Sequence, residues 1–180
     1  MKITNIFDAV REGTYDDVKR LYNGDINIID GYTGLNLLCL AVVNDKNPHD
    51  KINIIKFLIS EGIDVNYKDK KYSRNALHNF YFNVLRPSSE YMMQISKILI
   101  SSAIYINETD KYNAIPMKYA ITITKKATEE IKPVYWYLLE EGSNYMQQDI
   151  FGKSCVDYAN EYSWRNDFIE IIEEFRNANK

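Results

Sequence analysis

The side chains best suited to chemistry in this sequence are two histidines and two cysteines. His49 and His78 are the only histidines among 180 residues, and neither has a second residue at metal-ligand spacing. Cys39 and Cys155 each lie within an apolar run, which is typical of a buried thiol rather than a nucleophile. We therefore expect no metal, no cofactor and no catalytic residue. We expect His78 to bond nearby backbone and His49 to lie in a solvated loop.

A phosphate-binding loop and an enzyme site are both weakly supported. The string FGKS at 151–154 resembles the end of a phosphate-binding loop, but the glycine required five positions before Gly152 is Gln147. An enzyme with its site around Arg86 or the pair Glu129 and Glu130 is a remote alternative, because catalysis needs several convergent titratable groups. The sequence favours a non-catalytic protein.

The composition limits which partners and which cellular compartment we expect. Lysine and arginine total 22 against 25 acidic residues, so no basic excess is available to neutralise a nucleic acid. The stretch that begins with Met1 lacks an apolar run long enough for a signal peptide or a membrane span, and two cysteines do not make a disulfide framework. We expect a cytoplasmic protein that binds neither nucleic acid nor membrane.

An internal repeat organises the chain. The segment IIKFLISEGIDVNYKD at 54–69 is echoed at 95–110 and 134–149. Four aspartates recur in the same register at separations of 39, 41 and 39 residues: Asp30, Asp69, Asp110 and Asp149. Such a period predicts a stack of similar units, each covering the apolar face of its neighbour.

Each period contains two helical patterns. The second has apolar residues at i, i+3 and i+4 and ends in a glycine, Gly62 or Gly142, that suits a left-handed helix cap, with Ala103 in the middle copy. The first opens near 36–42, 75–80, 115–120 and 154–159. Its N-caps are Asn36, Asn75 and Ser154, and Pro116 fits a first helical turn.

These residues resemble the ankyrin repeat, whose consensus runs through T-P-L-H-x-A and ends in G-x-D-V-N. His78 matches the family's turn histidine and Pro116 its proline, and the small packing alanine and the closing motif are also present, at Ala41, Ala120, Ala159, Gly62, Asp64, Val65 and Asn66. The resemblance covers nearly the whole chain. It implies an all-α solenoid, like that of small stand-alone ankyrin proteins of bacteria and viruses.

The resemblance also implies the domain organisation. We expect one domain over 1–180, with a capping repeat at 1–28, internal repeats at 29–66, 67–107 and 108–146, and a closing cap at 147–180. The period exceeds the usual 33 residues, and the surplus lies near 44–51, 83–91 and 123–133, as longer helices or outer loops. The turns at 27–39 and 66–78 carry one extra residue, so their tips need not form a regular hairpin ladder.

The resemblance implies that the turn tips and the concave helix face bind another protein. An aromatic residue stands at every tip, and a strip of residues follows on the adjoining helix face. The predicted contact set is Tyr32, Leu40, Lys70, Lys71, Tyr72, Asn79, Tyr112, Tyr119, Phe151 and Tyr158. Lys68, Lys70 and Lys71 cluster at one tip and would attract an acidic patch on the partner.

Several alternatives stay open. The tyrosines could instead pack sideways on neighbouring turns and only stiffen the array. The protein could be an immunity protein that neutralises a toxin, or a viral or pathogen protein that engages a host factor. We expect a monomer when no partner is bound.

Overall fold

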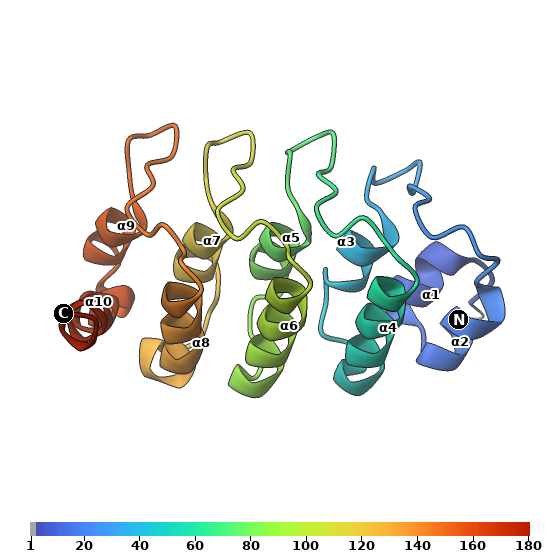
Figure 1. Ribbon diagram of the computed structural model, residues 1–180, viewed down its shortest axis with the longest axis horizontal. Coiled ribbons are helices and arrows are strands. Elements are labelled where there is room, and N and C mark those ends of the chain that lie inside the picture. Colours follow the sequence, from blue (N-terminus) through green and yellow to red (C-terminus); the bar gives the residue numbers. More distant parts are fainter. Residues whose placement is uncertain (1–2) are drawn as a thin grey trace.

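The computed structural model describes residues 3–180, and this part of the chain is all-helical, as the repeat pattern predicts. The helices form successive pairs, and the pairs stack along one axis from the N-terminus to the C-terminus (Figure 1). The first helices of the pairs contact one another in the order α1, α3, α5, α7, α9, and the second in the order α2, α4, α6, α8, α10. Their bounds are α1 (Ile6–Glu12), α2 (Tyr15–Leu21), α3 (Leu37–Ala41), α4 (Pro48–Ser60), α5 (Ala76–Asn83), α6 (Ser89–Ser101), α7 (Pro116–Thr122), α8 (Thr128–Glu140), α9 (Cys155–Glu161), the short 3₁₀ turn η1 (Ser163–Arg165) and α10 (Asp167–Ala178).

The first helices begin where the sequence predicts. The side chains of Asn36, Asn75 and Ser154 each accept the backbone N–H three positions on, at 2.9, 3.1 and 3.3 Å. Pro116 is the first residue of α7, where its missing N–H leaves no broken bond. Local capping chemistry therefore fixes the start of each short helix.

The second helices end as predicted too. Gly62 and Gly142 follow α4 and α8 with φ of +84° and +85°, a region that favours glycine. Ala103 occupies the same place after α6 with φ of +64°, so its Cβ strains the backbone there.

The core runs unbroken through the stack. Each of α4, α6 and α8 has thirteen residues, and Ile54, Ile95 and Val134 on their inner faces are fully buried. The surplus length of the period divides between these helices and the connections at 42–47, 84–88 and 123–127. Part of the predicted insertion at 123–133 is therefore helix rather than loop, because Glu130 and Ala127 close a capping arrangement that starts α8 at Thr128.

The last pair closes the stack. Phe168 and Ile171 of α10 are buried against the array, and its other face is charged, as expected for a cap. Arg165 is fully buried and donates hydrogen bonds to the carbonyls of Ile121 at 2.9 Å and Lys126 at 2.8 Å. Within residues 3–180 no helix combines the length and the apolar character needed to cross a bilayer.

Candidate functional site

A row of turns projects from one edge of the stack (Figure 1). Each turn contains an aspartate whose carboxylate accepts N–H groups of the residues that follow, and these are Asp30, Asp69, Asp110 and Asp149. In the third turn, Asp110 Oδ1 accepts from the N–H of Tyr112 at 2.9 Å and of Ala114 at 3.1 Å. Because the aspartates satisfy the amides of their own turns, the turns hold their shape without a partner.

Backbone hydrogen bonds join three of the turns into a ladder. The N–H of Lys111 donates to the carbonyl of Tyr72 at 2.8 Å, and the N–H of Ile150 donates to the carbonyl of Tyr112 at 2.9 Å. The second, third and fourth turns therefore form one rigid row. The second turn joins this row in spite of its extra residue, so the irregularity expected there does not reach the third turn.

The ladder breaks between the first and second turns. In the second turn the residue equivalent to Lys111 is Lys70, because each directly follows the aspartate of its turn, and the N–H of Lys70 donates to no carbonyl of the first turn within residues 3–180. The N–H of Lys71 donates to Asp69 Oδ1 at 3.0 Å, as the N–H of Tyr112 does to Asp110 in the third turn. The extra residue in each of these turns accounts for the missing bond, since their closing bonds, Asp30 N–H to Leu35 O and Asp69 N–H to Arg74 O, span five residues instead of four. In residues 3–180 no backbone hydrogen bond joins these two turns.

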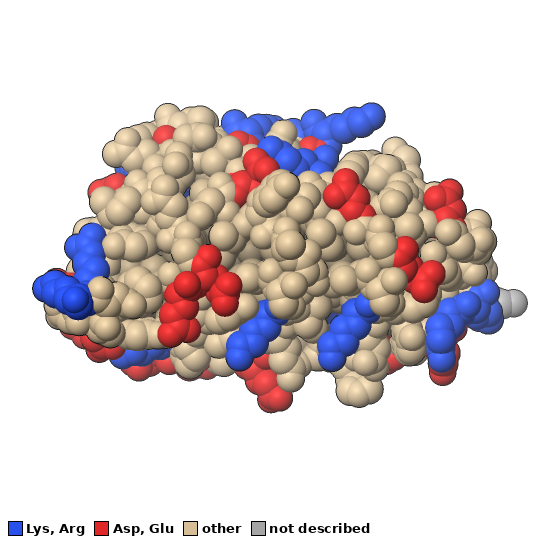
Figure 2. All heavy atoms as spheres, in the orientation of Figure 1, with Lys and Arg blue, Asp and Glu red and all other residues tan. Residues whose placement is uncertain are grey.

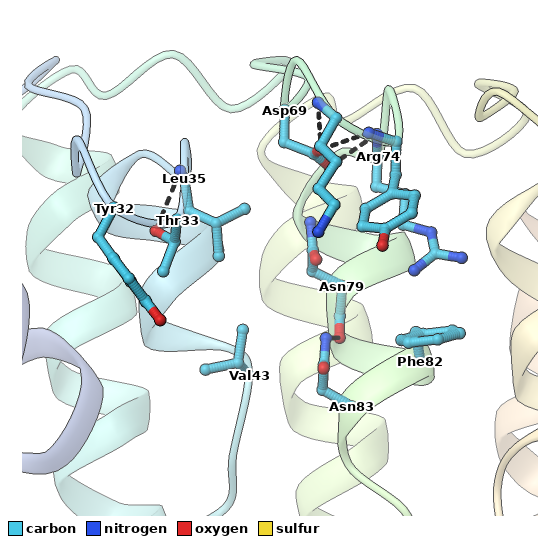
Figure 3. Close-up of a pocket in the computed structure, with 11 residues that line it drawn as sticks. Tyr32, Thr33, Leu35, Val43, Asp69, Arg74, Asn79, Phe82 and Asn83 are labelled. Atoms are coloured by element: carbon cyan, nitrogen blue, oxygen red, sulfur yellow. Dashed lines mark hydrogen bonds between the residues drawn. The ribbon is translucent and has the colours of Figure 1, made fainter.

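A groove of about 500 Å³ opens at this break. Figure 3 shows Tyr32, Thr33 and Leu35 on one side, with Asn79 and Asn83 of α5 across from them. The Tyr32 ring extends from its turn toward Val43 (Figure 3). The groove is therefore bounded by polar and apolar side chains from two different repeats.

A second, shallower groove continues along the same face. It has a volume of about 380 Å³ and shares Tyr72, Arg74 and Phe82 with the first. Its far end is lined by Tyr112 and Phe151 of the next two turns. The two grooves together make a continuous strip from Tyr32 to Phe151, which we call the turn-side strip.

Arg74 is the fixed cation at the centre of the turn-side strip. Its side chain is 6% exposed, and its Nε lies 3.2 Å from Asp110 Oδ2 of the next turn. Its guanidinium also lies over the Phe82 ring, 3.8 Å from the centroid. Burial alone would raise the pKa of Asp110, but hydrogen bonds from Tyr119, the turn amides and Arg74 outweigh it and hold this pKa below its ordinary value.

Two lysines stand over the aromatic side chains of the strip. The Nζ of Lys71 lies 5.0 Å and that of Lys111 4.1 Å from the centroid of the Tyr72 ring. Lys118 of α7 lies lower in the strip, with its Nζ 3.8 Å from Asp149. Burial lowers the pKa of Lys118 from its ordinary value. The strip thus alternates aromatic rings and cations.

Comparison with known proteins gives a distant match to a repeat protein. No protein family model matches the chain. Over 136 residues, 74% of its length, the chain is 26% identical to ankyrin repeat protein T5 of Rabbit fibroma virus (strain Kasza). The distant match and the stacked helix pairs make these repeats similar to ankyrin repeats. The matched segment makes up 25% of the length of the viral protein.

The turn tips expose part of the predicted contact set. Tyr32 is 96% and Phe151 is 68% exposed, and Lys70 and Lys71 also lie in solvent. Tyr72 and Tyr112 are half-buried, since Lys111 covers one side of each ring. The two end turns therefore offer free aromatic side chains, and the middle turns offer aromatic side chains beneath cations.

The predicted residues on the helix face are covered instead of open. Leu40, Asn79, Tyr119 and Tyr158 are at most 8% exposed. The hydroxyl of Tyr158 donates to Asp149 Oδ2 at 2.6 Å, so this ring supports its turn from beneath. The expectation that these four side chains lie open on a concave face is corrected: the turns fold back over them. Asn79 lines the first groove and Tyr119 lines the second.

Sequence reasoning did not select several residues of the strip. Arg74, Phe82, Lys111 and Lys118 line it or cover its rings, yet none belongs to the predicted contact set. The sequence could have indicated Arg74, because it is a charged residue directly before the N-cap Asn75, a position that faces the next turn. The sequence could not have indicated Phe82, since an aromatic residue late in a short helix ordinarily packs in the core.

The remaining chemical candidates have structural roles. His78 Nε2 lies 2.9 Å from the carbonyl of Ala114, and burial lowers the pKa of its imidazole to about 4. Cys39 and Cys155 are buried thiols, and burial raises the pKa of Cys155 to about 12. Glu130 pairs with Lys126 at 3.0 Å at the start of α8.

The site considered for an enzyme lies apart from the strip. Arg86 and Glu129 line a separate cavity of about 560 Å³ beside Trp164. Within residues 3–180, no group of three or more His, Cys, Asp and Glu side chains is arranged to hold a metal ion. The turn-side strip is therefore the candidate site that the fold itself builds.

Proposed function

We propose that the chain is a non-catalytic module that binds another protein through its turn tips and the turn-side strip. The observation that carries this proposal is the exposure of Tyr32 and Phe151 on turns already fixed by their own aspartates. Rigidly mounted aromatic side chains lose little entropy on binding and dominate the energy of interfaces. Ankyrin repeats typically mediate protein binding, which agrees with this use of the face.

In this proposal the chain acts as one domain. Its units are a first cap at 1–28, of which residues 1 and 2 lie outside the described part, internal repeats at 29–66, 67–107 and 108–146, and a closing cap at 147–180. The repeats share one core and the last three turns share one ladder. A partner would therefore meet a preformed surface and spend little free energy on ordering it, so steric masking or scaffolding is the proposed mode of action.

The test compares a double aromatic substitution at the tips with a single aromatic substitution elsewhere. The chain is immobilised and used to capture partners from its native cell, beside a variant with Tyr32→Ala and Phe151→Ala and a control with Tyr105→Ala. Tyr105 is 62% exposed but follows α6, outside the turns and the strip. Loss of a central aromatic contact costs about 2 kcal/mol or more, or about thirtyfold in Kd.

We expect one partner to bind the unchanged chain and the Tyr105→Ala control equally and to be lost from the double variant. Circular dichroism should give the same helix content for all three proteins. Equal capture by the double variant would remove the tips from the interface and contradict the proposal.

One observation favours a particular biological setting. The relative named above comes from a virus, which supports a role in engaging a host factor over a role as an immunity protein. The two settings differ in gene neighbourhood. A toxin reading frame directly upstream would favour the immunity protein instead.

A further inference from the structure

The charge of the turns differs from the charge of the chain. The formal net charge of the chain is -3, yet the charged side chains at the tips of the second and third turns are lysines. Figure 2 shows lysine and arginine side chains gathered at the upper edge, above the middle turns. In these turns Lys70, Lys71 and Lys111 are exposed and have no carboxylate within 4.0 Å in the described part of the chain.

The lysines have no acidic partner because the turn aspartates are bonded to the backbone of their own turns. Asp69 is 3% exposed, and its two oxygens accept the backbone N–H groups of Lys71, Tyr72 and Arg74. Asp110 is similarly enclosed and accepts from Arg74 and two turn amides. The acidic residues nearest to the lysines therefore face inward, and the lysines present their charge to solvent.

The groove at the ladder break has free polar groups along its length. The carbonyl of Thr33 in the first turn holds the place that the carbonyl of Tyr72 holds in the second, and it has no hydrogen-bond donor within residues 3–180, whereas the carbonyls of Tyr72 and Tyr112 are paired. Asn83 projects its side chain into the same groove from α5 (Figure 3). A backbone in extended conformation carries the N–H donors that such acceptors need.

The shape of the groove also indicates an extended ligand. Its volume of about 500 Å³ falls in the usual range for ligand sites, and it continues into the second groove past Arg74. Leu35, Val43 and Phe82 supply apolar contact between the polar groups. A peptide segment with an apolar side chain flanked by carboxylates would match both the apolar lining of the groove and the positive charge of the exposed lysines.

We propose that the turn-side strip binds an extended acidic segment of a partner protein, with an apolar side chain in the first groove and carboxylates toward Lys71 and Lys111. This inference rests on the proposed protein-binding function and specifies its partner. A nucleic acid is also acidic, but the net charge of the chain and the small number of unpaired lysines disfavour a polyanion.

The test is a selection from displayed random peptides of about twelve residues, long enough to span a strip of this kind. The bait is the whole chain, and the selected peptides are then measured against Lys71→Glu, Lys111→Glu and Lys97→Glu. Lys97 is an exposed lysine on α6, away from the turns, and controls for net charge. A single-stranded thymidine oligonucleotide serves as the polyanion probe.

We expect the selected peptides to be enriched in Asp and Glu around one apolar residue. Each strip variant should weaken their binding by about tenfold, and raising salt from about 50 to about 300 mM should weaken it further. Lys97→Glu should leave the affinity unchanged. All of these lysines are exposed, so each variant should keep the thermal stability of the parent chain.

Failure of this inference can be told apart from failure of the proposed function. Neutral or basic peptides that still require Tyr32 and Phe151 would overturn the acidic segment and leave the protein-binding face intact. An absence of selected peptides, binding insensitive to Lys71→Glu, or tighter binding of the oligonucleotide would each overturn the inference.

Discussion

Removal of the Asp110 carboxylate should destabilise the fold much more than removal of the Asp30 carboxylate. Both aspartates begin a turn at the same place in their repeats. Their surroundings differ, because the Asp110 side chain is completely buried beside the Arg74 guanidinium and Asp30 is half-buried without a cation within 4.0 Å. The comparison therefore separates the role of the buried ion pair from that of the turn itself.

The magnitude follows from the groups left without partners. Asp110→Ala leaves the buried Arg74 guanidinium without its carboxylate and removes the acceptor of the Tyr119 hydroxyl and of two turn amides, and loss of one member of a buried pair costs about 3–5 kcal/mol. Asp30→Ala removes hydrogen bonds to the amide and hydroxyl of Thr33, which water can replace at a cost of about 1 kcal/mol.

Equilibrium urea denaturation followed by circular dichroism measures both free energies of unfolding. A double variant with Asp110→Ala and Arg74→Met should recover more than about 1 kcal/mol relative to Asp110→Ala alone, because the unpaired charge is gone. Equal losses for Asp110→Ala and Asp30→Ala, or no recovery in the double variant, would refute the assigned role of Arg74.

Four further substitutions test the fold at separate points. Ala103→Gly should stabilise the chain by about 0.5–1 kcal/mol in urea denaturation, because φ of +64° strains a Cβ, and Gly142→Ala should lower stability by about 1 kcal/mol. Burial lowers the pKa of His78 to about 4, so the unfolded chain binds more protons between about pH 6.5 and 4 and stability should fall on acidification through that window. Denaturation at several pH values should show a smaller fall in His78→Gln. Arg165→Met should lose about 2–4 kcal/mol, because it frees four buried acceptors, and hydrogen exchange should accelerate first in α9 and α10.

Local chemistry made the helix ends predictable from the sequence. A cap depends on one side chain and the amide three positions away, so Asn36, Asn75 and Ser154 reveal helix starts without any knowledge of the fold. The recurrence of Asp69 and Asp110 in register gave the stack for a similar reason. Each aspartate closes a turn within its own repeat, whatever the neighbours are.

The exposure of the predicted contact residues on the first helices could not be predicted in the same way. The first helices have only five to eight residues, too few for periodicity to distinguish the face under the turns from the face in the core. Tyr119 and Tyr158 also carry a hydroxyl, which is typical of a side chain at the surface. In the folded chain that hydroxyl reaches back to an aspartate of its own turn.

The ladder break was only half visible in the sequence. The extra residue in the first two turns indicated an irregular tip, but not which neighbour it would affect. The first two turns have the same length, yet the Tyr72 carbonyl of the second turn still accepts from the N–H of Lys111, while the N–H of Lys70 donates to no carbonyl of the first turn within residues 3–180. Such a difference follows from three-dimensional register rather than from residue type.

The most direct test of the binding face is hydrogen exchange on the chain with and without its captured partner. The account predicts slower exchange at the tips of the turns around Tyr32, Tyr72 and Phe151, and unchanged exchange in α4 and α6. Protection confined to those outer helices, with the turns unaffected, would contradict it.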